Sequence, residues 1–205
     1  MAFRWSRIPY DVIRHHIPEN AWLLLLPLIE GQPLHIILWD HRQSKFGDYR
    51  SPDNHGIHRI SVNKSQNHYS FLITLIHELA HMMVYERYGQ NKQPHGREWK
   101  HVFRSMLMPF IQAGCFPPDL TRELHRHLEN PKATTASDLS LSKMLSSYDS
   151  DGGVLLEDVP TDTVFRLENG MVFRKGEKRR SRYSCTRIQD DRLYYVNALA
   201  RVEVV

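Results

Sequence analysis

His77, Glu78 and His81, in the segment HELAH, have the types and spacing to hold a metal ion and activate water. On an α-helix, residues four apart lie about 40° apart around the axis and one turn apart along it. Both imidazoles can therefore reach one ion. Glu78 lies beside them, where it can take a proton from a water that zinc has made more acidic. The pattern predicts metal-assisted hydrolysis with Glu78 as the general base.

The segment that carries this motif is apolar on nearly every side. We expect a helix over Tyr69–Tyr88, begun by Asn67 or Ser70 and ended by Gly89. A helix of this kind lies in the core, where ionisable side chains are costly unless something satisfies them, as a metal does. The alternative is a chance pattern on a surface helix, expected in roughly a few per cent of histidine-rich chains of this length. The apolar surroundings favour the metal site.

A catalytic zinc needs a third protein ligand and one open position. The segment PHGREWKH, over 94–101, offers His95, Glu98 and His101. His95 directly precedes an expected helix, and Gly96 would let the backbone fold close to the metal. Spacing favours His95 only modestly. Glu98 is the second choice as the third ligand. If it is not a ligand, it is a candidate for orienting one of the metal-binding side chains.

The elements around the motif predict an α+β fold over 1–148, with a small sheet packed on helices. We expect strands over 34–39 and 57–62, with turns between them near 46–48 and 51–54. Further helices are expected over 21–29, 96–112, 118–130 and 138–147. The apolar run 21–29 lacks the flanks of a signal peptide and is too short to span a bilayer. Together with only two cysteines, it predicts a cytoplasmic protein with no membrane partner.

The composition changes after residue 148. Residues 149–162 hold five acidic side chains, no basic ones and a Gly-Gly pair, which predicts an acidic linker. Residues 163–205 read as short strands, and Asn169-Gly170 between two alternating runs is a strong hairpin signal. Ten Lys or Arg residues against five acidic ones make this part basic, although the whole chain carries only a net charge of +4. We therefore expect a small basic β-unit.

Several of these stretches together resemble the SprT-like family of zinc metallopeptidases, which includes the Spartan and Wss proteases of DNA–protein crosslink repair. They are Arg42, the run Lys45–Tyr49, the strand Ile60–Asn63, the HELAH helix and Pro94–Lys100. The resemblance covers roughly 33–112. It implies a zincin-like domain with one Zn²⁺ per chain, held by His77, His81 and His95, with Glu78 as the base. It thereby selects His95 as the third ligand.

The tail departs from the family pattern. Many SprT proteins end in a zinc ribbon with two cysteine pairs, whereas this tail keeps Cys185 and has Ile188 where its partner would stand. A lone thiolate cannot hold a structural zinc. We therefore expect the β-unit to fold without metal.

Basic residues cluster in this tail and are candidates for contacting a nucleic-acid backbone. They are Arg174, Lys175, Lys178, Arg179, Arg180 and Arg182. The alternative is a solvated hairpin neutralised by the acidic linker. Arg42 and Lys45 are candidates for flanking the cleft. The alternative, which the sequence favours equally, is that they are surface charges without a role.

The expected function is zinc-dependent peptide-bond hydrolysis, with DNA-bound or DNA-crosslinked proteins as the substrates that the resemblance suggests. The alternative from another class is a DNA- or partner-binding protein whose zinc is structural, without peptidase activity. Hydrolysis of a non-peptide bond is a third reading of the same motif. Replacing Glu78 separates the first two, because a structural site does not need that carboxylate.

Overall fold

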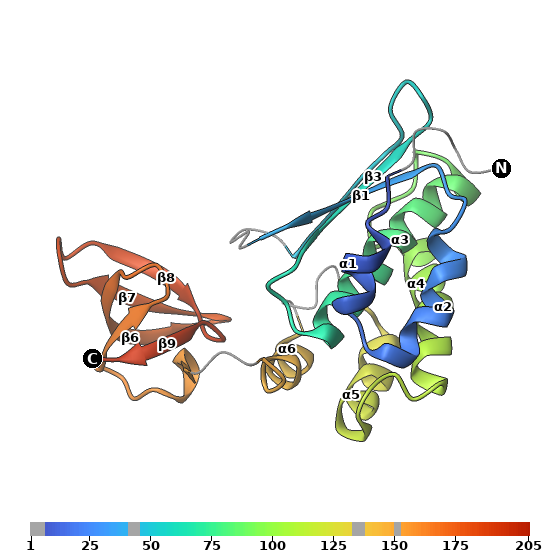
Figure 1. The fold of residues 1–205 in the computed structure, drawn as a ribbon. Helices are drawn as coiled ribbons and strands as arrows, with labels where there is room; N and C mark the ends of the chain where they lie inside the picture. Colours follow the sequence, from blue (N-terminus) through green and yellow to red (C-terminus); the bar gives the residue numbers. More distant parts are fainter. Residues whose placement is uncertain (1–6, 41–45, 133–137, 150–152) are drawn as a thin grey trace. The chain divides into compact units, whose positions relative to one another are not determined.

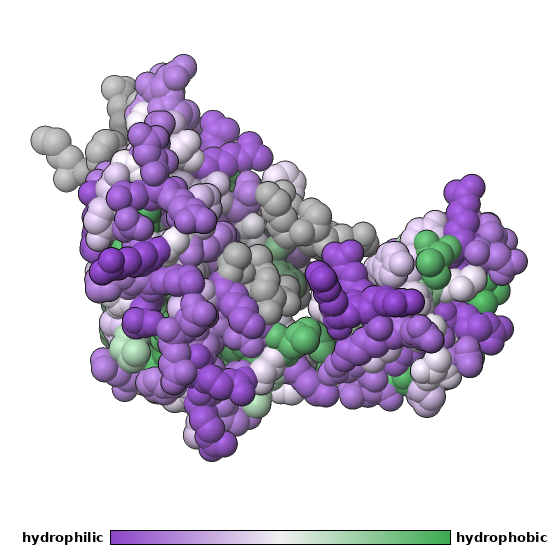
Figure 2. Space-filling view, turned by 180° about the vertical axis from the view of Figure 1, so that it is seen from behind, coloured by the Kyte–Doolittle hydropathy of each residue, from purple (hydrophilic) through white to green (hydrophobic). Residues whose placement is uncertain are grey.

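A computed structural model describes residues 7–40, 46–132, 138–149 and 153–205. The chain divides into two compact units, Met1–Asp149 and Ser150–Val205, and Figure 1 shows the elements of each. Hydrophilic residues cover most of the face drawn in Figure 2. Within the described residues, no helix combines the length and the apolar character needed to cross a membrane.

The first unit is a three-stranded sheet with helices on one side of it (Figure 1). The strands β1 (Leu34–Trp39), β3 (His58–Asn63) and β2 (Gly47–Arg50) lie in that order, β1 parallel and β2 antiparallel to β3. The helices are α1 (Tyr10–His15), η1 (Glu19–Ala21), α2 (Trp22–Ile29), α3 (His68–Tyr88), α4 (Arg97–Gln112), α5 (Pro118–Glu129) and α6 (Leu139–Ser146). The α+β expectation is confirmed.

The long helix α3 packs against β2, β3 and α4. Its apolar residues explain this position, because side chains around its whole circumference are buried, among them Phe71, Leu75 and Leu79. Asn67 caps the helix by accepting a hydrogen bond from the Ser70 amide at 2.9 Å. Gly89 ends it with a φ of 76°, a left-handed conformation that favours glycine. The motif therefore lies on a buried helix with the expected ends.

Strand β2 replaces one of the turns that the sequence analysis expected. Gly47 and Asp48 favour turns locally, but both pair with β3, opposite Val62 and Ser61. Pairing along β3 satisfies the backbone groups of this segment, and this tertiary gain outweighs the local preference.

The second unit is a six-stranded antiparallel sheet in the order β4-β9-β5-β6-β7-β8. Its elements are β4 (Val154–Leu155), η3 (Leu156–Asp158), β5 (Val164–Leu167), β6 (Val172–Arg179), β7 (Arg182–Arg187), β8 (Leu193–Asn197) and β9 (Arg201–Val204). Phe165, Phe173 and Cys185 are buried in a core of its own. The Asn-Gly turn joins β5 to β6, with Gly170 at a φ of 81°.

The expectation of an acidic linker over 149–162 is wrong for residues 153–162, which belong to the second unit. Leu156 and Val159 are buried in its core between the acidic residues. The ammonium of Lys175 donates hydrogen bonds to the carbonyls of Leu156, Glu157 and Val159. The two buried side chains and these hydrogen bonds fix the segment to the second unit, although its acidic residues had suggested a linker exposed to solvent.

Candidate metal centre

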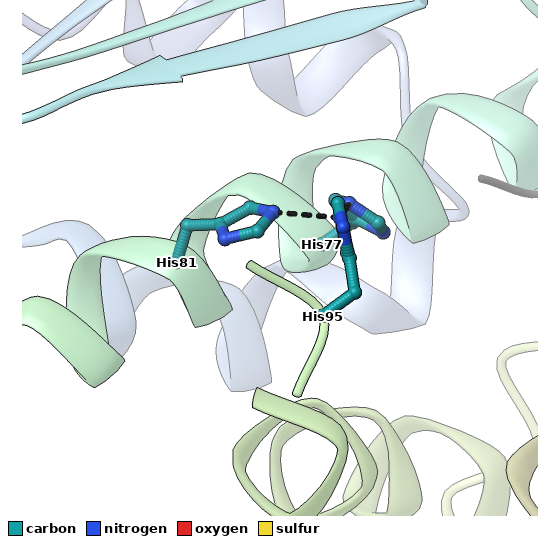
Figure 3. A group of neighbouring side chains, drawn as sticks. All are labelled: His77, His81 and His95. Atoms are coloured by element: carbon teal, nitrogen blue, oxygen red, sulfur yellow. Dashed lines mark hydrogen bonds between the residues drawn. The ribbon is translucent and has the colours of Figure 1, made fainter. Parts of the chain in front are cut away.

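Three histidine side chains converge at one point (Figure 3). His77 and His81 project from neighbouring turns of α3, and His95 comes from the loop before α4. The Nε2 atom of His95 lies 3.0 Å from Nε2 of His77 and 3.0 Å from Nε2 of His81. The three ligand atoms all lie within 4.8 Å of one another, a group that could hold a metal ion. The structure thus brings together the three histidines that the sequence analysis singled out.

Burial keeps these imidazoles in the neutral form that binds metals. It lowers the pKa of His77 to about 2, with the nearby His81, His95 and His127 adding to the effect. It lowers the pKa of His81 to about 4, again with help from His95, and it lowers the pKa of His95. Like charges and low polarity both disfavour protonation. At neutral pH the nitrogen lone pairs remain available to a cation.

A tight turn aims His95 at the other two rings. His95 has a φ of 58°, which non-glycine residues seldom adopt. The amide of Gly96 donates to the Gln93 carbonyl at 2.9 Å, and a Cβ atom at Gly96 would lie 2.9 Å from that oxygen. Only glycine fits there without displacing the backbone. Backbone strain of this kind gathers at functional sites.

Glu78 directly follows His77 on α3 and is buried, with 7% of its surface exposed. Strand β2 passes directly over its side chain: a Cβ atom at Gly47 would lie 2.5 Å from Glu78 Oε1 and 2.7 Å from the Thr74 methyl group. The glycine therefore leaves the space that the carboxylate occupies. The sequence analysis gave Gly47 to a turn and to the run Lys45–Tyr49 that resembles the family, and its place in a pairing strand could not be read from local signals.

Comparison with known proteins places this centre in a family. The SprT-like family matches residues 28–115. A segment of 54 residues is 43% identical to Protein SprT of Glaesserella parasuis serovar 5 (strain SH0165). Residues 28–115 belong to the SprT-like family. The aligned segment spans 25% of this chain and only 34% of the length of Protein SprT. No solved structure matches the chain.

The side chain of Trp99 forms one wall of the metal centre in this SprT-like domain. Its ring centroid lies 4.5 Å from that of His77, 5.4 Å from that of His81 and 4.7 Å from that of His95. The Phe103 ring stacks on Trp99 with centroids 4.8 Å apart and also lies 5.7 Å from the His77 ring. Trp99 is 1% exposed, so it excludes water from behind the triad. Its place four residues after His95, in the first turn of α4, is the signal that could have identified it.

A second wall comes from β2 and β3. The Tyr49 ring lies parallel to that of His81, with centroids 6.0 Å apart, and its hydroxyl is 2.9 Å from His58 Nδ1. His58 Nε2 lies 2.8 Å from Glu86 Oε1, which closes a chain of contacts back to α3. Burial, with Tyr85 and Glu86 nearby, raises the pKa of Tyr49. No ligand spacing marks Tyr49 or His58 in the sequence, because strand pairing brings them here.

Glu98 does not join the triad. Its carboxylate lies 2.9 Å from Lys92 Nζ, and this hydrogen bond lowers its pKa. Among the residues that the structure describes, the metal-binding group contains neither Glu98 nor His101. Arg42 and Lys45, which we expected to flank the cleft or lie on the surface, fall outside the described residues.

The basic residues of the tail divide into two kinds. Lys175 is 2% exposed, and its ammonium lies 3.8 Å from the centre of the Tyr183 ring besides bonding the carbonyls named above. The expectation that Lys175 contacts nucleic acid is therefore wrong, since its charge is used within the core of the second unit. The other five are exposed: Arg174, Lys178, Arg179, Arg180 and Arg182.

Proposed function

We propose that this protein is a zinc-dependent metalloendopeptidase that hydrolyses peptide bonds. The observation that carries the proposal is the convergence of three imidazole Nε2 atoms, two of them from the helix that also carries the buried Glu78. Membership of the SprT-like family supports it. Under this proposal His77, His81 and His95 hold the ion, and Glu78 is the catalytic base.

The donor set fits zinc. Two nitrogens bound at zinc's usual 2.0–2.1 Å in a tetrahedron lie about 3.3 Å apart, close to the 3.0 Å found here between His95 and each partner. Neutral imidazoles suit zinc, and three protein ligands leave one position for water or substrate. A bound zinc ion would acidify that water and polarise the scissile carbonyl.

Glu78 supplies the proton transfers. Its carboxylate takes a proton from the attacking water and delivers it to the nitrogen of the leaving amine. The carboxylate is held in place by its position between α3 and Gly47 of β2. Trp99 and Tyr49 keep the imidazoles oriented from two sides.

Replacement of Glu78 by Gln tests this function. We expect the variant to keep one zinc per chain and to lose peptide cleavage by about 10²–10⁴-fold, the usual contribution of a general base. Zinc is measured by elemental analysis, and cleavage with unfolded protein substrates. His81→Ala is the comparison that should lose the metal as well.

Two results would contradict the proposal. One is a Glu78→Gln variant as active as the wild type. The other is a zinc-loaded wild type that cleaves no protein with or without DNA, which would favour a binding protein with a structural zinc.

We propose further that the β6–β7 hairpin contacts nucleic acid and that the substrates are DNA-bound or DNA-crosslinked proteins. Four exposed cations gather at the hairpin's end: Lys178, Arg179, Arg180 and Arg182. Lys178 lies 3.5 Å from Glu157, and Arg179 lies 3.6 Å from Glu177. These exposed pairs are weak, so phosphates can compete for both cations.

Binding to single-stranded DNA over a range of salt tests this second proposal. Replacing Arg179, Arg180 and Arg182 by Gln should weaken binding and reduce the salt slope by roughly 0.7 for each phosphate that the variant no longer neutralises. Arg166→Gln, which removes a charge paired with Glu203 on another part of the sheet, is the control. Binding that is absent, or that does not change with salt, would refute the proposal.

A further inference from the structure

A basic cavity adjoins the metal centre. It has a volume of 590 Å³ and includes Gln93 and His95 of the loop and Arg97, Lys100, His101 and Arg104 of α4 in its lining. The four helical residues follow the i, i+3, i+4, i+7 pattern and so share one face of α4. His95 belongs both to this cavity and to the histidine triad. The cavity is therefore next to the position where a substrate would react.

The charges of this cavity have few counterions of their own. Lys100 donates to the amide oxygen of Asn130 at 2.7 Å, and Arg104 donates to the carbonyl of Leu128 at 2.8 Å. Both partners are neutral. Within the described part of the chain, no carboxylate forms an ion pair with Arg97, Lys100 or Arg104. The first turn of α4 also carries Glu98, whose carboxylate lies 2.9 Å from Lys92 Nζ.

We propose that this cavity is a subsite for an anionic side chain of the polypeptide substrate. The chemistry it selects is a carboxylate of Asp or Glu, or the phosphate of a phosphoserine. Guanidinium and ammonium groups bind both, and Arg does so with paired hydrogen bonds. The shared wall at His95 makes a substrate side chain the best occupant, because a peptide bond held at the triad places its flanking residues within a few ångströms. The inference rests on the proposed peptidase function.

The test compares matched peptides. Quenched fluorescent peptides of one cleavable sequence carry Glu, Gln, phosphoserine or Ser at each position flanking the scissile bond in turn. At one position, we expect kcat/KM to favour Glu over Gln by roughly fivefold, the effect of about one partly exposed ion pair. Salt should reduce the preference. A similar ratio of phosphoserine to Ser would show that phosphate is accepted, and a ratio of one would restrict the subsite to carboxylates.

Charge-removing variants locate the preference. Arg97→Gln and Lys100→Gln should each bring the Glu-to-Gln ratio towards one, and Lys100→Glu should invert it. Arg14→Gln removes an exposed charge from α1, outside the cavity, and should leave the ratio unchanged. Zinc content and circular dichroism verify that each variant folds. Binding of the same peptides to zinc-loaded Glu78→Gln, which does not depend on turnover, should show the same ratios.

The outcomes are distinguishable. Cleavage of Glu and Gln peptides at equal rates at every position overturns the subsite and leaves the peptidase function standing. Failure to cleave any peptide overturns the peptidase function itself. If Lys100→Gln loses affinity for a single-stranded oligonucleotide and leaves the peptide ratio unchanged, the cavity takes a nucleic-acid phosphate, and the subsite is refuted.

Discussion

At the scale of single residues, the candidate centre depends on two glycines that carry no chemistry. Gly96 permits the close turn that presents His95, and Gly47 leaves room for the carboxylate of Glu78. His77, His81 and Glu78 could be predicted because their spacing follows one helix, whereas His95 was selected by the family resemblance. The places of Gly47, Tyr49 and His58 at the centre could not be predicted, since strand pairing brings them there, although the run Lys45–Tyr49 was recognised as resembling the family.

Replacing Gly47 by Ala should misplace the base and leave the metal bound. The added methyl group would overlap Glu78 Oε1 and the Thr74 methyl group, so the carboxylate must move. A displacement of about 1 Å can cost on the order of a hundredfold in rate. We expect such a loss in peptide cleavage with unchanged zinc stoichiometry.

Gly56→Ala is the control for this variant. Gly56 has a φ of 73° and open space where a Cβ atom would stand, so alanine there strains the backbone away from Glu78. It should lower stability and leave the rate per folded molecule unchanged. Full activity in Gly47→Ala would show that Glu78 does not need this position.

At the scale of elements, Asn67 joins two helices through one side chain. Its oxygen caps α3, while its amide group donates to the Leu145 carbonyl at 2.9 Å and to Asp149 Oδ1 at 2.6 Å. The cap was one of two predicted from the sequence. The bonds to the end of α6 were not predictable, because they join residues about eighty positions apart.

Asn67→Ala should therefore destabilise the first unit. Losing a helix cap costs about 1–2 kcal/mol, which corresponds to a fall in Tm of roughly 3–6 °C for a unit of this size. Thermal unfolding followed by circular dichroism measures the change. Ser70→Ala, in the first turn of the same helix, is the control. It removes the Ser70 hydroxyl, but the backbone amide of residue 70 still donates to Asn67 Oδ1. An equal fall in both variants would show that the Asn67 side chain has no special role.

At the scale of the whole molecule, the two units have separate cores and different ways of staying folded. The first has the larger hydrophobic core, built around α3. The second buries few large side chains and relies also on Lys175, which ties η3 to the sheet. We predicted the basic β-unit from the sequence but assigned residues 153–162 to a linker. The acidic residues of that segment suggested exposure to solvent, whereas Leu156 and Val159 within it are buried.

Lys175→Met should destabilise the second unit alone. The carbonyls of Leu156, Glu157 and Val159 would lose their common donor, at a cost of roughly 2 kcal/mol or more. All four tryptophans, at positions 5, 22, 39 and 99, lie in the first unit. Three of the nine tyrosines, Tyr183, Tyr194 and Tyr195, lie in the second unit. Part of the change in tyrosine absorbance and in circular dichroism should therefore move to a lower temperature, while the tryptophan fluorescence transition stays in place.

Two results would contradict this expectation. A tryptophan transition that moves with the tyrosine signal would mean that the units unfold together. An unchanged tyrosine signal would mean that the carbonyls find other donors. Arg179→Met, which removes an exposed charge that pairs with Glu177 of the same strand and not with η3, is the matched control.

His95 forms part of both the metal-binding group and the basic cavity. Two ligands that share a side chain are thermodynamically linked, and the linkage is reciprocal: if an anion in the cavity changes the affinity for the ion, the ion changes the affinity for the anion by the same factor. Charge attraction between a cation and an anion gives this coupling a favourable sign. An acidic substrate would then help to retain the metal that cleaves it, and a chain that has lost its metal would also release such substrates more readily.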